Sequence, residues 1–167
     1  ARLCLSCHYG TKDKLATHKI MGAGHPRLSF ELETFTANQP MHYRVDADYK
    51  RRKGEFSGFA MWVTGQLEAA ETSLALMQAY LISDNHLLPE LFFYDCHACH
   101  HPMSDKRWQP TAARAGLPPG AVRLNDANFL MLQALTKVVM PESSSPLTQA
   151  VICLLYTSPS PRDDISS

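Results

Sequence analysis

The residues most able to do chemistry lie in two copies of one short pattern. In each copy, two cysteines are separated by two residues and are followed directly by a histidine. The first copy is Cys4, Cys7 and His8, and the second is Cys96, Cys99 and His100. A C-x-x-C-H string is the attachment signal for c-type haem, because both thiols add to the vinyl groups of one porphyrin while the imidazole binds its iron. The sequence therefore predicts two haems c held by four thioether bonds, with His8 and His100 as proximal ligands. Electron transfer is the first function to consider.

A zinc-binding module is the main alternative for these cysteines, because two Cys pairs could supply four thiolates to a tetrahedral metal. Zinc ribbons usually place their pairs closer together in the chain, and they do not need a histidine after each second cysteine. A dithiol redox pair would need only one motif, in a strand and helix context. The spacing and the histidines favour haem.

The charge of the chain excludes some classes of partner. Its 167 residues include 16 basic and 16 acidic side chains, so the formal net charge is zero. Bulk charge therefore indicates neither nucleic-acid binding nor attachment to a membrane surface. Two haems would add four propionates, which makes Arg27 and the basic run at residues 50–53 candidate contacts for propionates or partner proteins. A solvated loop is the favoured interpretation of the run itself.

Three helices position the motifs. Apolar residues recur every three or four positions over residues 57–82, which predicts a helix that covers a core. A second helix is expected to open at Pro89 and Glu90 and to continue into the second motif. A third is expected over residues 126–139, capped by Asn125 or Asp126 and too short to span a membrane. No strand pattern is persuasive, so the predicted fold class is mainly α with extensive coil.

Both ends of the chain look unnatural. It begins at Ala1, three residues before the first motif, and no signal peptide is visible. The Ser- and Pro-rich residues 142–167 end in a string that resembles a translated sequencing adapter. We therefore expect a truncated N-terminus, one domain over residues 1–141, and a non-native or disordered tail over residues 142–167.

The chain is rich in histidines that could fill the second axial position of each iron, which favours bis-histidine ligation. His18 and His25 stand seven residues apart, with Gly22 and Gly24 between them. The glycines make a regular helix there doubtful and suggest backbone that passes close to a porphyrin. His101 directly follows the second motif, so its ring points away from the iron of His100 and could reach another haem. His42 ranks behind these three candidates.

The chain also resembles a family of multihaem c-type cytochromes that is often likened to the tetrahaem electron carriers of nitrifying bacteria. The resemblance rests on the two haem motifs and on four segments: 18–21, 24–32, 89–91 and 95–101. It covers roughly residues 1–140 and implies an architecture organised around covalently bound haems. It also implies a periplasmic or otherwise exported electron carrier, redox partner proteins, and a further haem domain in the intact protein. Tyr43 is a departure, because relatives tend to have Trp at that position.

The predicted function is electron transfer by closely spaced haems, with both axial sites of each iron filled. One alternative is a haem enzyme that keeps an open iron position and acts on a small nitrogen or sulfur compound. Nothing in the sequence identifies a pocket for such a substrate.

Overall fold

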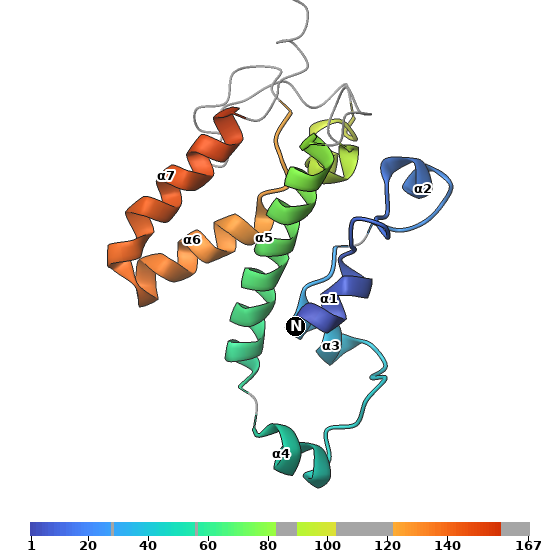
Figure 1. Cartoon of the computed structure of the whole chain (residues 1–167), viewed down its shortest axis with the longest axis vertical. Helices are drawn as coiled ribbons and strands as arrows, with labels where there is room; N and C mark the ends of the chain where they lie inside the picture. Colours follow the sequence, from blue (N-terminus) through green and yellow to red (C-terminus); the bar gives the residue numbers. More distant parts are fainter. Residues whose placement is uncertain (28, 56, 83–89, 103–121, 158–167) are drawn as a thin grey trace, which may run out of the picture. The chain divides into compact units, whose positions relative to one another are not determined.

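The computed structural model describes residues 1–27, 29–55, 57–82, 90–102 and 122–157. The described residues are mainly α-helical, as predicted, and their β-pairing consists of two isolated bridges. They form two compact units, Ala1–Leu76 and Met77–Ser167, and the long helix α5 (Gly58–Ile82) contributes to both (Figure 1). Within the described ranges, no helix is long and apolar enough to cross a membrane.

The first unit contains four short helices and the N-terminal part of α5. They are α1 (Arg2–His8), α2 (His18–Gly22), α3 (Leu32–Asn38) and α4 (Ala47–Lys53). Three begin at a side chain that accepts a backbone hydrogen bond: Thr17 for α2, Glu31 for α3 and Asp46 for α4. Such caps satisfy amide groups that a helix start leaves without a partner, so the local sequence fixes where these helices begin.

The core of the first unit forms around α5. Its fully or nearly buried apolar side chains are Leu5, Tyr9, Leu15, Ala16, Leu32, Ala69, Ala70 and Leu76. Leu32 of α3 lies close to Gly65 of α5, where an added Cβ would lie 2.8 Å from the Cβ of Leu32. A glycine is therefore needed at this position for the two helices to pack as they do.

The second unit begins with the last turns of α5 and carries the second motif. Two 3₁₀ turns, η1 (Leu91–Phe93) and η2 (Cys96–Ala98), precede α6 (Ala127–Val139) and α7 (Pro141–Thr157). Tyr94 pairs with Leu124 in an antiparallel bridge. Helix α6 packs against α7, and the two meet at an angle near Met140 (Figure 1).

The helix predicted over residues 57–82 is confirmed, and so is the one predicted over 126–139. The prediction of a single helix running from Glu90 into the second motif is wrong. Phe92, Phe93 and Tyr94 are all buried, and three consecutive residues cannot share one helix face. Tyr94 is extended instead (φ −98°, ψ 158°), which ends η1 and separates it from η2. Pro89 lies outside the described residues.

Helix α7 occupies a stretch where the sequence analysis expected a non-native or disordered tail. Leu147, Val151 and Leu154 recur at helical spacing, and Val151 is only 4% exposed. This stripe indicates an amphipathic helix, and packing against α6 stabilises it despite Pro146 in its interior. Residues 158–167 lie outside the described part of the chain.

Candidate functional site

One side of helix α1 carries the first motif, and another side packs into the core of the first unit. Leu5, 1% exposed, and Tyr9, 4% exposed, are four residues apart and point into the core of the first unit. Cys4 and Cys7 are exposed and His8 is half-buried. Residues three and four positions apart are neighbours on a helix, so both thiols and the imidazole lie on the same side of α1. This is the arrangement that one porphyrin requires.

A pair of ionic contacts ties the start of α1 to α5. The Arg2 guanidinium donates from Nε to Glu68 (2.9 Å) and from Nη2 to Glu71 (3.4 Å). The hydrogen bond to Glu68, together with the charges of both carboxylates, raises the pKa of Arg2. Such exposed pairs add little to stability.

A hollow of about 570 Å³ lies beside Cys4 in the first unit. This volume falls within the range of about 300–1,000 Å³ that is typical of small-molecule and cofactor pockets. Its walls are mainly apolar and aromatic, with a few charged groups at the edge. The apolar lining includes Leu32, Met41, Tyr43, Val45, Tyr49 and Met61, and the charged lining is Glu33, Lys50 and Glu55.

A smaller hollow of about 20 Å³ adjoins the larger one and brings two histidines together. Both hollows are lined by Cys4 and Tyr43, and His8, Phe30 and His42 line the smaller one. The rings of His8 and Phe30 stack with centroids 4.3 Å apart. The ring centroids of His8 and His42 are 5.8 Å apart, and their planes differ by only 15°. The structure thus places beside His8 the histidine that ranked last among the distal candidates.

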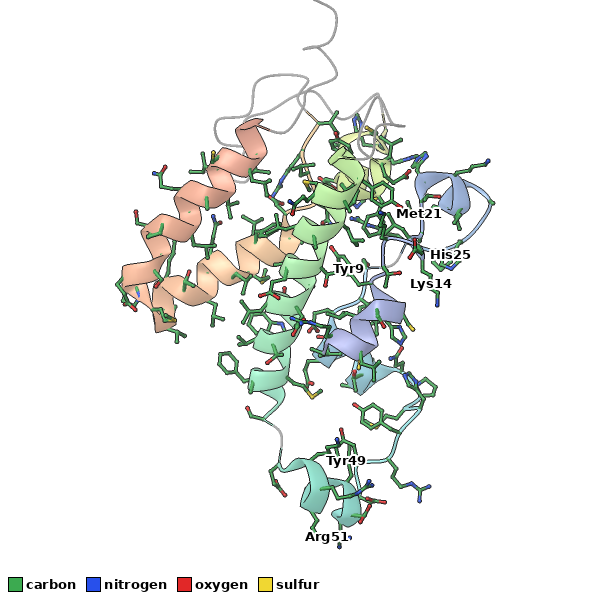
Figure 2. All side chains as sticks on the ribbon, viewed as in Figure 1. Tyr9, Lys14, Met21, His25, Tyr49 and Arg51 are labelled. Carbon is green, nitrogen blue, oxygen red and sulfur yellow. The ribbon has the colours of Figure 1, made fainter. Side chains whose placement is uncertain are left out.

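His18 and His25 lie elsewhere in the first unit. Helix α2 begins at His18 and ends at Gly22, and Gly24 has a φ of +103°, so no regular helix joins the two histidines. His25 lies in the loop that follows α2 (Figure 2) and is exposed. Its Nδ1 lies 2.6 Å from the carbonyl oxygen of Pro26. Neither residue lines the two hollows beside Cys4.

Arg27 is half-buried near Tyr9 rather than at the wall of either hollow. Burial raises the pKa of Tyr9, while a hydrogen bond with Ser73 and the charge of Arg27 act in the opposite direction. The contact of Arg27 with a propionate stays a prediction.

The basic run forms the last turn of α4, where the sequence analysis favoured a loop. The Lys50 ammonium lies 3.2 Å from Glu55, and both residues line the larger hollow. Arg51 and Arg52 each pair with Asp48. Lys50 is therefore the cation of this run that the fold places at the cavity.

The second motif is held by local hydrogen bonds in the second unit. Asp95 caps η2 by accepting from the His97 amide (3.1 Å), and the His100 amide donates to the Cys96 carbonyl (2.7 Å). Cys96 is half-buried, whereas Cys99 and His100 are exposed.

The neighbouring chain fixes where this motif starts. The Asp95 amide donates to the Arg123 carbonyl (2.8 Å), and the Arg123 Nε in turn donates to the carboxylate of Asp126 (3.1 Å). Asp126 is only 4% exposed, so this ion pair is largely shielded from water. His101 is half-buried, with Nδ1 3.3 Å from the Pro102 carbonyl oxygen. Its role as a distal ligand stays a prediction.

The donor set of the first motif fits haem c. Across the described ranges, no group of three or more His, Cys, Asp or Glu side chains is placed to hold a bare metal ion. Haem attachment needs instead two thiols, an imidazole and an apolar space for the macrocycle, and α1 with its adjoining hollow provides each of these.

No protein-family model, no curated protein and no solved structure matches this chain.

The sequence analysis missed the residues that form the cavity, above all Tyr49 and Met61. Tyr43 was noted only as a departure from relatives, although it stacks on Tyr49 with ring centroids 5.8 Å apart. Burial raises the pKa of the Tyr43 hydroxyl, with the neighbouring Tyr49 adding to the effect. The aromatic residues near position 43 are a signal for this wall, whereas Met61 lines the same hollow from α5, far away in the sequence.

Proposed function

We propose that this chain is an electron-transfer protein of the multihaem c-type cytochrome kind, with one haem c on each motif. The observation that carries the proposal is the first motif. Cys4, Cys7 and His8 share one side of α1, and Cys4 lines a mainly apolar hollow of about 570 Å³. The second motif repeats the same residues in the other unit, which supports a second attachment site.

In this proposal Cys4 and Cys7 anchor the porphyrin. Each S–H would add across one vinyl C=C bond, so a thioether would form without a leaving group or an external oxidant. His8 would hold the iron, and bound haem would supply a one-electron couple. The apolar wall that includes Leu32 and Met41 would cover part of the macrocycle.

Lys50 offers a cation at the edge of the same hollow, where an acidic propionate would gain a charge-assisted hydrogen bond. Lys53, at the end of α4, is exposed and is suited to contact an acidic partner protein. The proposal includes redox partner proteins, a further haem domain in the intact protein, and a periplasmic or otherwise exported location. The location follows from the attachment of c-type haem outside the cytoplasm.

The test is to produce the chain in a host that attaches haem c and to measure its intact mass and its reduced pyridine haemochrome spectrum. We expect the polypeptide mass plus two haems. Cys153→Ser is the matched control, because Cys153 belongs to neither motif, and it should also carry two haems. The reduced protein should show no prompt spectral shift with carbon monoxide, since a carrier with two filled axial sites binds no small ligand.

Three results would contradict the proposal. Colourless protein with titratable thiols and bound zinc would identify a zinc-binding module instead. Colourless protein without metal would leave the cysteines with no haem role. A prompt carbon monoxide shift at both haems would eliminate the carrier and favour an enzyme that acts on a small nitrogen or sulfur compound.

A further inference from the structure

The first motif has a second imidazole within reach of the same iron. We infer that His42 is the distal ligand that opposes His8 at the first haem. The inference rests on the proposed attachment of haem at Cys4 and Cys7, and it assigns the sixth coordination site that the motif leaves open. It also excludes His18 and His25 as ligands of that iron.

The distance between the rings of His8 and His42 fits two ligands of one iron. Each iron–nitrogen bond is about 2 Å long and each ring nitrogen lies about 1 Å from its ring centre, so two imidazoles on opposite faces of one haem have centroids about 6 Å apart. The centroids of His8 and His42 are 5.8 Å apart. The two rings therefore have the spacing that a shared iron would require, and the hollow of about 20 Å³ that they line must widen toward the larger hollow to admit the macrocycle.

His8 and His42 also line the same part of the first unit. His8 and His42 line the same small hollow, and Cys4, the first thioether residue, lines it as well. That hollow shares several wall residues, including Leu32 and Met41, with the large hollow beside Cys4. A haem anchored at Cys4 and bound through His8 thus has His42 among its nearest imidazoles.

The imidazole rings of His8 and His42 differ in how freely they can turn. Coordination would need one nitrogen of each ring to point at the same atom, and the angle of 15° between the two ring planes is compatible with this. His42 is exposed, and rotation of its ring disturbs no buried packing. His8 is held more firmly, because it is half-buried and stacked on Phe30 at 4.3 Å. His8 can thus stay in place while His42 adjusts.

The positions of the competing histidines support the assignment. His18 starts α2, and His25 lies beyond the positive-φ turn at Gly24. The Nδ1 of His25 already lies 2.6 Å from a backbone oxygen. Neither imidazole shares a hollow with His8, so either one would need a movement of the α2 segment to reach that iron.

The test compares His42→Ala with the matched variants His18→Ala and His25→Ala in the haem-loaded full chain. Electron paramagnetic resonance reports the spin state of each ferric haem, and carbon monoxide binding reports an open site on the reduced iron. We expect His42→Ala to convert one of the two haems to a high-spin form that binds carbon monoxide. Added imidazole should restore its low-spin signal. The other two variants should keep the wild-type spectrum at this haem.

His42→Met provides a second measurement that does not depend on loss of a ligand. A thioether in place of an imidazole should leave the haem low-spin but raise its reduction potential, because His/Met ligation favours the reduced iron. Because His42 is exposed, both substitutions should leave folding unchanged.

The inference is overturned if His42→Ala keeps both haems low-spin, or if His18→Ala or His25→Ala opens the first haem instead. It is also overturned if the first haem of the wild-type protein is already high-spin, although haem attachment would then still stand. Absence of covalent haem from the wild-type chain is a different result, since it contradicts the proposed function itself.

Discussion

Tyr9 shows how one buried polar residue supports the first motif. It directly follows His8, caps the end of α1 and is only 4% exposed. Burial raises its pKa above the ordinary value of 10.0. The residue therefore keeps its proton in the folded protein over a range of pH in which the unfolded chain loses it.

This shift makes alkaline stability a test of the position of Tyr9. Below about pH 10 both states hold the proton, and the contribution of Tyr9 to the free energy of unfolding is fully present. As the pH rises further, the unfolded state binds fewer protons than the folded state, so stability falls. Urea unfolding followed by circular dichroism at pH 8 and pH 11 measures the loss.

We expect Tyr9→Phe to reduce this alkaline loss, because phenylalanine has no proton to release. At pH 8 the variant should be destabilised by about 0.5–1.5 kcal/mol through loss of the hydrogen bond with Ser73. An unchanged alkaline loss in Tyr9→Phe would show that Tyr9 is not buried in solution. The raised pKa values of Tyr43 and Tyr94 predict a residual loss.

At the scale of elements, Leu32 of α3 packs against Gly65 of α5 beside the cavity. Leu32 starts α3, lines both hollows beside Cys4 and is 6% exposed. Gly65 of α5 permits this contact, since any Cβ there would meet the Cβ of Leu32 at 2.8 Å.

Gly65→Ala should therefore destabilise the protein by about 1–3 kcal/mol, the usual cost of overpacking a core. The clash outweighs the gain of about 1 kcal/mol that alanine has over glycine in a helix interior. Thermal unfolding followed by circular dichroism measures the difference. If this variant were more stable than the wild type, helix propensity would outweigh the contact, and α3 would not pack on α5 as described.

Gly58→Ala is the matched control in the same helix. Its added Cβ would lie 2.8 Å from the Glu33 carboxylate oxygen, at the flexible end of a side chain that can move away. We expect a change of no more than about 0.5 kcal/mol in the free energy of unfolding, measured in the same way. A large loss of stability in Gly58→Ala would indicate that residues other than Glu33 also pack closely against the start of α5.

At the scale of the whole molecule, each motif belongs to its own compact unit, the first within Ala1–Leu76 and the second within Met77–Ser167. Each motif is also positioned by contacts inside its own unit, through Arg2 and Glu68 for the first and through Asp95 and Arg123 for the second.

Haem loading at the two motifs should therefore be independent. The double variant Cys4→Ala/Cys7→Ala should carry one haem by intact mass, and Cys96→Ala/Cys99→Ala should also carry one. Loss of both haems from either variant would show that attachment at one motif requires the other.

The sequence alone determined the features that depend on neighbours in the chain. The thiols and imidazole of each C-x-x-C-H string are fixed by spacing, and α5 and α6 follow from apolar periodicity, because a helix is built from hydrogen bonds between residues four apart. The glycines between His18 and His25 correctly indicated that no regular helix joins them.

The tertiary structure decided what depends on residues far apart in the sequence. The chain before the second motif became 3₁₀ turns because Tyr94 pairs with Leu124, and α7 formed because it packs on α6. The local sequence favours His25 over His42, through its spacing from His18 and the glycines between them. The fold instead brings residues 8, 30 and 42 to one hollow that His25 does not line, because contacts between residues far apart in the sequence form only when the chain packs.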